Sequence, residues 1–462
     1  MLAAFKQKYI GDRAFYKRYL FLAIPMIIQN FITNFVSFLD NIMVGQLGTE
    51  QMAGVAIVNQ LNFVYSLATF GMVAAAGIFG AQFYGKGDAE GHMYTFRFRL
   101  LGTLFVTVAA LFIFAFLGGD LVSLYLTQGD STSNINLAYG YAMEYLHIIL
   151  FGLIPFAFTQ AYASIIKETG QSFVPMVAGL SGVISNAILD YLLIFGIGFF
   201  PKLGVSGAAL ATVIARFIES GIVISWAHSH TNENKYLVNA YKSLVIPREL
   251  VGRILVKGAP LMLNEVLWAA GITALTQSYS VRGLDVVAAL NIANTINNLF
   301  NIVFIQLGGC ISIIVGQYLG AGELERAKDA DNKMIFFSVA SCVVMAALMF
   351  MVGHLFPAIY NTSPEIKALA TSFIYIQALS MPFCAFSHCS YFTIRSGGKT
   401  LVTFLFDSVF TWVVMVSTAK LLLAFTALPI VTIFFIVTFT ELIKNLMGYI
   451  MVKSNVWLVQ MV

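Results

Sequence analysis

Long apolar runs separated by short polar segments dominate the chain. Twelve runs are long enough to cross a bilayer as helices, since a transmembrane helix needs about 20 predominantly apolar residues. The short alternating segments of a transmembrane β-barrel are not seen. The predicted spans cover residues 19–43, 52–79, 98–118, 138–162, 173–196, 204–228, 258–281, 287–315, 334–356, 368–394, 401–424 and 427–451.

The composition supports the same class of protein. Hydrophobic residues make up 59% of the 462 residues and charged residues 10%, against about 45–50% and about 25% in soluble domains. We therefore predict an all-α polytopic membrane protein. The first 18 residues are polar and basic and no small-residue cleavage site follows the first apolar run, so no cleavable signal peptide is expected. The net charge of +4 is too small to indicate a nucleic-acid partner.

One stretch of the chain occurs twice. Residues 59–90 and 294–325 align without gaps at an offset of 235. A constant offset of about half the chain indicates that one domain was duplicated. The same residue recurs at the pairs Asn59/Asn294, Asn62/Asn297, Ile78/Ile313, Gln82/Gln317, Gly85/Gly320, Gly87/Gly322 and Glu90/Glu325, and at the same offset outside the stretch at Arg18/Arg253 and Pro25/Pro260.

The distribution of lysine and arginine predicts the orientation in the membrane. With the N-terminus inside, 21 of the 26 basic residues fall in cytoplasmic segments, four fall outside and Arg216 lies within a span. Cytoplasmic loops carry such an excess of basic residues. We therefore predict a multi-pass protein of the cell (inner) membrane with both termini in the cytoplasm.

Each copy then holds six spans, an even number, so both copies enter the membrane in the same direction. Parallel repeats of this kind are related by an axis along the membrane normal. We predict an N-terminal six-helix bundle over residues 1–228, a cytoplasmic linker with an interfacial helix over 229–257, and a C-terminal six-helix bundle over 258–462. Two facing bundles leave a cleft suited to alternating access.

Acidic residues inside the first six spans are the first candidates for function, because a charge at the bilayer centre costs at least about 2.5–3.5 kcal/mol. Asp40 lies on a polar stripe of the first span, and Asp190 shares a face of the fifth span with Asn186. Two carboxylates at similar depth could share a cation or hold a proton, with Thr212 of the sixth span as a further oxygen ligand. Alternatively, Asp40 lies at the outer interface and bonds to the loop, and Thr212 is a packing contact. The stripe comprises Asn30, Thr33, Asn34, Ser37, Asp40 and Asn41.

The second six spans carry a different set of polar residues. Glu265 lies mid-span in the seventh helix, where the first copy has Asn30. It is a candidate carboxylate for a cation or substrate, or else pairs with a neighbouring amide or lysine. The eighth span has an amide-rich face that either lines a wetted cavity or packs helices together. Asp407 is interpreted as structural, and Arg216 and Glu219, at i,i+3 spacing, as neutralising each other. The amide-rich face comprises Asn291, Asn294, Asn297, Asn298 and Asn301.

Several classes of site are not indicated. The Gly85-Lys-Gly and Gly320-Ala-Gly pieces lack the Gly-Lys-Ser/Thr ending of a phosphate loop and are interpreted as tight turns. The four cysteines show no CxxC spacing, so neither a disulfide framework nor a cysteine metal site is predicted. No HExxH or similar motif suggests an enzyme, and no cofactor is expected.

Three sets of residues together resemble the multidrug and toxic compound extrusion (MATE) family. They are LDNIMVGQLG at the end of the first span, the Gln-x-x-Gly-x-Gly-Asp/Glu turns at Gln82 and Gln317, and the equivalent turns that begin at Lys167 and Arg395. Two parallel six-helix copies are also this family's architecture, and the resemblance covers nearly the whole chain. It implies antiport, in which H⁺ or Na⁺ drives export of amphipathic, mostly cationic organic compounds by a monomer among membrane lipids.

The resemblance also implies roles for residues. Asp40, Asn186, Asp190 and Thr212 match the polar cluster of the first bundle in the DinF-like branch, with a possible Na⁺ at the first three. Glu265 matches the seventh-span acid of the NorM-like and eukaryotic branches, and Asn34, Asn294 and Asn298 are candidates for the same substrate or second cation site. The chain departs from the NorM-like pattern at residues 384–388 of the tenth span, where no aspartate occurs. We therefore expect coupling in the first bundle.

The alternative function within the same superfamily is a flippase of lipid-linked oligosaccharides. Such proteins line their cleft with several basic residues for a pyrophosphate, whereas here almost every lysine and arginine is predicted outside the spans. An intramembrane enzyme and a purely structural or receptor protein are further alternatives, which the missing catalytic motif and the buried acids respectively disfavour.

Overall fold

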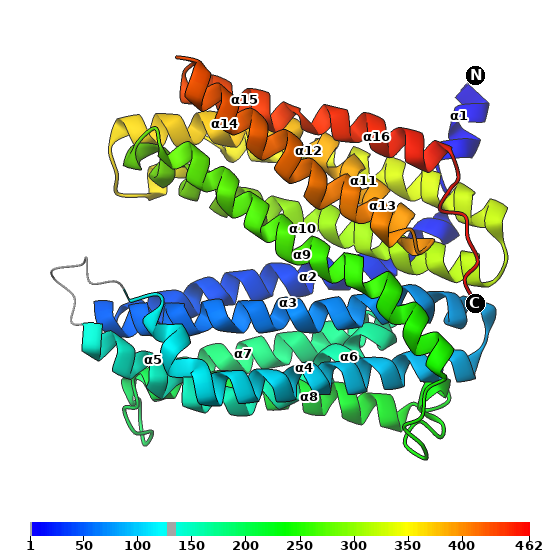
Figure 1. The fold of residues 1–462 in the computed structure, drawn as a ribbon, viewed down its shortest axis with the longest axis horizontal. Helices are drawn as coiled ribbons and strands as arrows, with labels where there is room; N and C mark the ends of the chain where they lie inside the picture. Colours follow the sequence, from blue (N-terminus) through cyan, green and yellow to red (C-terminus); the bar gives the residue numbers. More distant parts are fainter. Residues whose placement is uncertain (1, 127–134) are drawn as a thin grey trace. The chain divides into compact units, whose positions relative to one another are not determined.

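The computed structural model describes residues 2–126 and 135–462, except for the side chains of residues 2–4 and of Phe38. These residues form helices and connecting segments, and no β-strand occurs among them (Figure 1). The α-helices are α1 (Leu2–Tyr9), α2 (Arg13–Gly45), α3 (Thr49–Lys86), α4 (Ala89–Ser123), α5 (Ile135–Ile149), α6 (Leu153–Glu168), α7 (Phe173–Phe195), α8 (Val205–Ser229), α9 (Arg248–Ser280), α10 (Leu284–Gly320), α11 (Leu324–Val352), α12 (Pro364–Ser396), α13 (Thr400–Phe404), α14 (Ser417–Phe425), α15 (Ile430–Phe439) and α16 (Glu441–Lys453).

Eleven helical segments in the described part of the chain are long and apolar enough to cross a membrane. Four of these segments join shorter helices: residues 5–45 combine the end of α1 with α2, residues 135–168 combine α5 and α6, residues 400–425 combine α13 and α14 through two π-helical turns, and residues 430–453 combine α15 and α16. The remaining predicted span corresponds to α9, a helix of 33 residues. The predicted all-α fold is confirmed, and the helices are consistent with a count of twelve.

The duplication is visible in the helix bounds. Helices α2 and α9 each have 33 residues, begin 235 positions apart and contain a proline at the same place, Pro25 and Pro260. Helices α3 and α10 also begin 235 positions apart, as do α4 and α11. The first three helices of each copy therefore follow one pattern.

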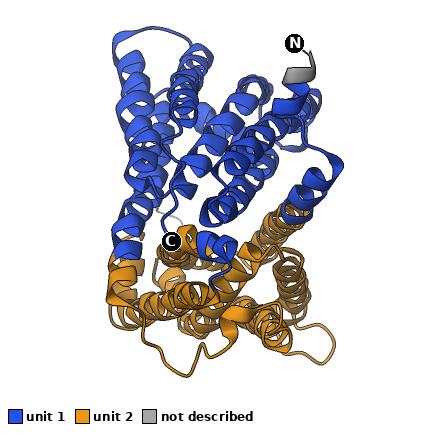
Figure 2. Cartoon of the chain, turned by 90° about the vertical axis from the view of Figure 1, so that its right-hand side faces the viewer, with its two compact units in different colours: residues 1–23, 81–88, 253–462 blue, residues 24–80, 89–252 orange. Residues whose placement is uncertain are grey.

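The chain divides into two compact units, coloured in Figure 2. Unit 1 comprises residues 1–23, 81–88 and 253–462, and unit 2 comprises residues 24–80 and 89–252. Unit 1 contains an apolar core to which Phe373 and Val437 belong. Unit 2 contains a core around Leu146 and another around Phe96. The bundle boundaries predicted along the sequence stay predictions. When the chain is divided by the contacts between its residues, the start of the chain and the end of α3 belong to unit 1.

The segment between the two copies differs from the predicted linker in one respect. Residues 248–257, expected as a separate interfacial helix, are the first turns of the continuous helix α9. The preceding loop is held against α4 by Arg97, whose guanidinium donates hydrogen bonds to the carbonyl oxygens of Asn239, Ala240 and Val245 at 2.9, 2.8 and 3.0 Å. The apolar positions that predict an interfacial helix therefore form one continuous helix with the seventh predicted span.

The repeated Gln-x-x-Gly motif ends α3 and α10 within unit 1. A Cβ atom built on Gly85 would overlap the backbone of Gln317, and one on Gly320 would overlap the backbone of Gln82. The glutamine side chains are also used: Gln82 Nε2 donates to the carbonyl oxygens of Ser396 and Val459, both at 3.1 Å. Glycine is thus required in the last turns because two backbones meet there.

The glycines two positions further on, Gly87 and Gly322, are required for their backbone conformation. Gly87 and Gly322 have φ values of 77° and 75°, in the left-handed region that glycine adopts without steric cost. They follow the C-terminal ends of α3 and α10 and reverse the chain. The prediction of tight turns at the two Gly-x-Gly pieces is confirmed.

Gly85→Ala is expected to lower the thermal unfolding temperature of the purified protein, because the added methyl group forces apart the backbones of α3 and α10. Overpacking of this kind costs about 1–3 kcal/mol. The control is Gly221→Ala in α8, where a Cβ atom meets nothing within 4 Å. A Gly85→Ala protein as stable as the control would show that the crossing is not tightly packed.

Candidate functional site

The first candidate site lies in unit 2, where Asp40 of α2 and Asp190 of α7 come together. The two carboxyl groups are within hydrogen-bonding reach of each other. The same helices also meet at Gln29 and Gly179, eleven residues before each aspartate. Helices α2 and α7 therefore lie side by side in the same direction over about three turns.

Asp190 is completely buried, and neither of its carboxylate oxygens receives a hydrogen bond from a donor in the described part of the chain. An ionised carboxylate can only accept hydrogen bonds, and a buried charge without a partner is strongly disfavoured. With the half-buried Asp40 beside it, Asp190 can be satisfied by a proton shared between the two carboxylates or by a bound cation. The pair therefore has the chemistry of an ion-binding site.

Asn186 and Thr212 complete this cluster. Asn186, one turn before Asp190, donates from Nδ2 to Thr212 Oγ1 at 3.4 Å. The helices that carry them, α7 and α8, are close because a Cβ on Gly207 would lie 2.7 Å from the backbone of Leu193, a packing that small residues permit between membrane helices. The buried hydroxyl of Tyr145 is within hydrogen-bonding reach of Thr212 and was not singled out from the sequence.

The predicted neutralisation of Arg216 by Glu219 is not formed as an ion pair in the described residues. Instead the Arg216 guanidinium lies over the ring of Phe156, 5.2 Å from its centroid, and packs beside Gly152. The i,i+3 spacing places the two residues on one face of α8, but the arginine side chain extends towards the helix next to it. Arg216 thus lies near the cluster rather than paired on its own helix.

The four residues of the second predicted site are divided between the units, with Asn34 in unit 2 and Glu265, Asn294 and Asn298 in unit 1. In unit 1, Asn294 accepts at Oδ1 a hydrogen bond of 2.9 Å from Gln377 Nε2, whereas Asn298 is exposed. Glu265 of α9 lies within electrostatic range of Arg395 and Asp407. In unit 2, Asn34 donates to the carbonyl oxygen of Asn30 in its own helix.

The most developed polar network of unit 1 is centred on Asp407, which the sequence suggested to be structural. Lys444 Nζ donates to Asp407 Oδ1 at 2.8 Å, and Asn264 Nδ2 donates to Oδ2 at 3.1 Å. Ser408 donates to Asn264 Oδ1 at 2.7 Å. Lys444 had been counted among the cytoplasmic bases, although it lies in a predicted span; an acid and a base in neighbouring spans were the signal that would have revealed the pair.

Other basic residues are also buried and paired. Arg99 is completely buried in unit 2 and is ion-paired with Glu168, beside His92. Arg99 and Lys444 are thus buried basic residues, in addition to the half-buried Arg216. The charges of Arg99 and Lys444 are already compensated by carboxylates.

No group of three or more His, Cys, Asp and Glu side chains in the described residues could hold a metal ion. The predicted Na⁺ site is of a different kind, with two carboxylates and an amide. Oxygen atoms are the ligands that hard cations such as Na⁺ prefer, so the residues present are chemically suited to it.

Comparison with known proteins identifies the chain's relatives. The MatE family model matches residues 25–192 and 260–419, one segment in each copy. Probable multidrug resistance protein YoeA of Bacillus subtilis is 25% identical over 419 residues, which cover 89% of this chain and 87% of the relative. Probable multidrug resistance protein NorM of Thermotoga maritima is 24% identical over 412 residues, which cover 88% of this chain and 85% of the relative.

Solved structures share the fold. One, described as an outward-facing conformation of a multidrug resistance MATE family transporter of the MOP superfamily, has a TM-score of 0.83 and 20% identity and covers 97% of this chain and 98% of that chain. A MATE structure in the straight conformation has a TM-score of 0.83 and 20% identity, with 96% of each chain covered. With the family model matched over both halves, this chain belongs to the MATE family of multidrug efflux transporters.

Proposed function

We propose that the protein is a secondary antiporter that exports amphipathic, mostly cationic organic compounds in exchange for H⁺ or Na⁺ by alternating access. Membership of a transporter family, and not of an enzyme family, gives the class. The observation that carries the coupling is the Asp40–Asp190 pair, in which Asp190 is completely buried and both of its carboxylate oxygens lack a donor in the described chain. The multidrug resistance names of the relatives support the substrate class.

The proposed cycle follows from the charge of this pair. A single H⁺ or Na⁺ arriving from outside binds between Asp40 and Asp190 and removes one of their two negative charges, with the oxygens of Asn186 and Thr212 as neighbours. The less charged pair has less need of the hydrogen-bond donors that stabilise a charge, so the packing of α2 against α7 can change. Release of the ion to the cytoplasm restores the charge, and the cationic compound leaves on the outer side.

The remaining features of the transporter are proposed on the same basis. The excess of basic residues in predicted cytoplasmic segments favours an inner-membrane protein with both termini in the cytoplasm. Glu265, Asn34, Asn294 and Asn298 remain candidates for contact with substrate or a second cation. We expect a monomer, surrounded by membrane lipids, that needs no cofactor.

A flippase of lipid-linked oligosaccharides is less well supported. It would need several available bases to hold a pyrophosphate, whereas the buried Arg99 and Lys444 are already ion-paired with Glu168 and Asp407. Carboxylates bound to these bases compete with phosphate for the same donors. The pairing favours antiport of organic cations.

Transport by the purified protein in liposomes tests the proposal. A fluorescent organic cation is placed inside the vesicles, and a proton gradient and a sodium gradient are imposed separately. Antiport predicts that one of the two gradients accelerates release of the cation at least several-fold over protein-free vesicles. Dissipating the gradient with an ionophore should return release to the leak rate.

Glu265→Gln provides the companion measurement in the same vesicles. With coupling in the first bundle, the gradient should still accelerate export in this variant, even where the apparent affinity for the cation changes. Loss of gradient dependence in Glu265→Gln would move the coupling site to unit 1. A wild-type protein that responds to neither gradient would contradict antiport altogether.

A further inference from the structure

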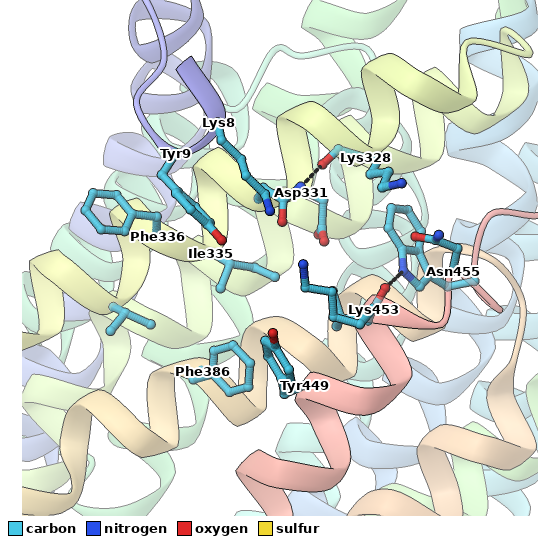
Figure 3. Close-up of a pocket in the computed structure, with 14 residues that line it drawn as sticks. Lys8, Tyr9, Lys328, Asp331, Ile335, Phe336, Phe386, Tyr449, Lys453 and Asn455 are labelled. Carbon is cyan, nitrogen blue, oxygen red and sulfur yellow. Dashed lines mark hydrogen bonds between the residues drawn. The ribbon is translucent and has the colours of Figure 1, made fainter. Parts of the chain in front are cut away.

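A pocket of about 400 Å³ lies in unit 1, and none of its lining residues belongs to either polar network described above. Figure 3 shows its lining, contributed by α1, α11, α12 and α16 and by the residues that follow α16. The lining combines lysines, two tyrosines and an apolar wall, and no part of the proposed antiport cycle uses it.

The basic side chains of the pocket come from three separate elements. Lys8 belongs to α1, Lys328 to α11 and Lys453 to the end of α16. The side chains of Lys8 and Lys453 extend towards one another (Figure 3), with their nitrogens within hydrogen-bonding reach. None of the three lysines forms an ion pair with a carboxylate in the described residues. Two ammonium groups at such range repel each other unless an anion lies between them.

One carboxylate also lines the pocket and has to be considered. Asp331 of α11 is buried and accepts a hydrogen bond of 2.5 Å from Thr393 Oγ1 of α12. Its charge offsets at most one of the three lysines, so the pocket keeps a positive excess. The remaining titratable groups of the lining are the phenols of Tyr9 and Tyr449, whose rings lie beneath Lys8 and Lys453 at 5.2 and 5.9 Å.

The apolar part of the lining gives the pocket a second character. Ile335, Phe336 and Val339 of α11 form a wall together with Phe386 and Val452. Helix α1 is docked onto this wall by Phe5 and Tyr9, whose ring centroids lie 5.7 and 5.9 Å from that of Phe336.

The neighbouring surface of α16 is apolar and open to the surroundings. Leu446 and Ile450 have 62% and 57% of their surface exposed, as expected of side chains that contact acyl chains in a membrane helix. A site that combines basic groups with an apolar wall suits an amphipathic anion, because the lysines can bind its charged group and the wall can contact its apolar part. Basic pockets between membrane helices on the cytoplasmic side bind anionic headgroups.

We propose that this pocket binds the headgroup phosphate of an anionic phospholipid of the cytoplasmic leaflet, held between Lys8 and Lys453, with Lys328 adding positive charge and an acyl chain against the Phe336 wall. The lipid fastens α1 to α11 and α16. A soluble phosphate compound would share the contacts with the lysines but not those with the wall. The proposal is independent of the ion and of the substrate that the transporter uses.

Native mass spectrometry of the full-length protein in detergent tests this site, with phosphatidylglycerol and phosphatidylcholine added at equal concentration. Wild type is expected to retain phosphatidylglycerol in preference. Lys8→Gln combined with Lys453→Gln should weaken its binding roughly 30-fold, since each lysine near an anionic lipid contributes about 1 kcal/mol. Lys8→Arg with Lys453→Arg keeps the charge and should keep the preference.

The matched control is Lys6→Gln with Lys17→Gln, which removes the same charge from exposed positions outside the pocket. Equal weakening in the control pair would show that general surface charge attracts the lipid and would overturn the proposal. Displacement of phosphatidylglycerol by millimolar inorganic phosphate would assign the pocket to a soluble phosphate instead. No preference for phosphatidylglycerol in the wild type would also refute it.

Discussion

Asp190→Asn is expected to reduce gradient-driven export to the passive leak, a loss of about 100-fold or more. The amide has the shape of the carboxylate, but it neither takes up a proton nor offers a charge to Na⁺. An ion drives the conformational change only if it binds one state of the transporter more tightly than the other. Moving a two-state equilibrium from 1:99 to 99:1 requires a difference of about 5.5 kcal/mol in binding free energy, and without ion binding this difference is lost. The initial rate of export from the liposomes, with and without the gradient, measures the effect.

The pairing of Asp190 with Asp40 adds a stricter test of the same result. The two carboxyls lie within hydrogen-bonding reach of each other, so coupling at this pair predicts that Asp40→Asn alone is nearly as damaging and that the double variant is no worse than either single variant. Asp120→Asn, an exposed aspartate in α4, is the control and should export normally. Full gradient-driven export by Asp190→Asn protein at wild-type level in the vesicles would rule out coupling at this pair.

The fold could be predicted to a large extent because membrane helices have a strong local signal. A run of apolar residues gives the length of each span, and the 235-residue offset relates α2 to α9 and α3 to α10. Helix starts are less well predicted, because α4, α9 and α11 begin at residues 89, 248 and 324, nine or ten residues before the predicted spans. Polar and charged residues in these first turns interrupt the apolar pattern, so the pattern does not include them in the span.

The candidate site was predicted only in part, for a physical reason. Sequence gives the depth of a side chain and its face on its own helix, which was enough to associate Asp40 with Asp190 and Asn186. It does not give the direction that the face points relative to other helices. The Asp407–Lys444 pair spans two helices, and Arg216 reaches Phe156 instead of Glu219. Contacts of this kind depend on the packing of the bundle.

Lys444→Met is expected to destabilise the protein strongly, by about 3–5 kcal/mol, the cost of leaving one member of a buried ion pair without its partner. Lys444 and Asp407 have only 9% and 13% of their side-chain surface exposed, so water cannot replace the lost ammonium group. Glu441, 3.9 Å from Lys444, would also lose its nearest base. The expected observation is a lower thermal unfolding temperature and a smaller monodisperse fraction after solubilisation.

The identity of the lost interaction can be established by rescue. Adding Asp407→Asn to Lys444→Met removes the unpaired charge of Asp407, so most of the lost stability should return, while Glu441 still lacks its nearest base. Lys333→Met is the matched control: Lys333 pairs with the exposed Asp329 at 2.5 Å, and such surface pairs are worth about 0–1 kcal/mol. If Lys444→Met folds as stably as the control yet exports nothing, the Asp407–Lys444 pair belongs to the transport machinery of unit 1, and coupling through Asp40 and Asp190 alone is insufficient.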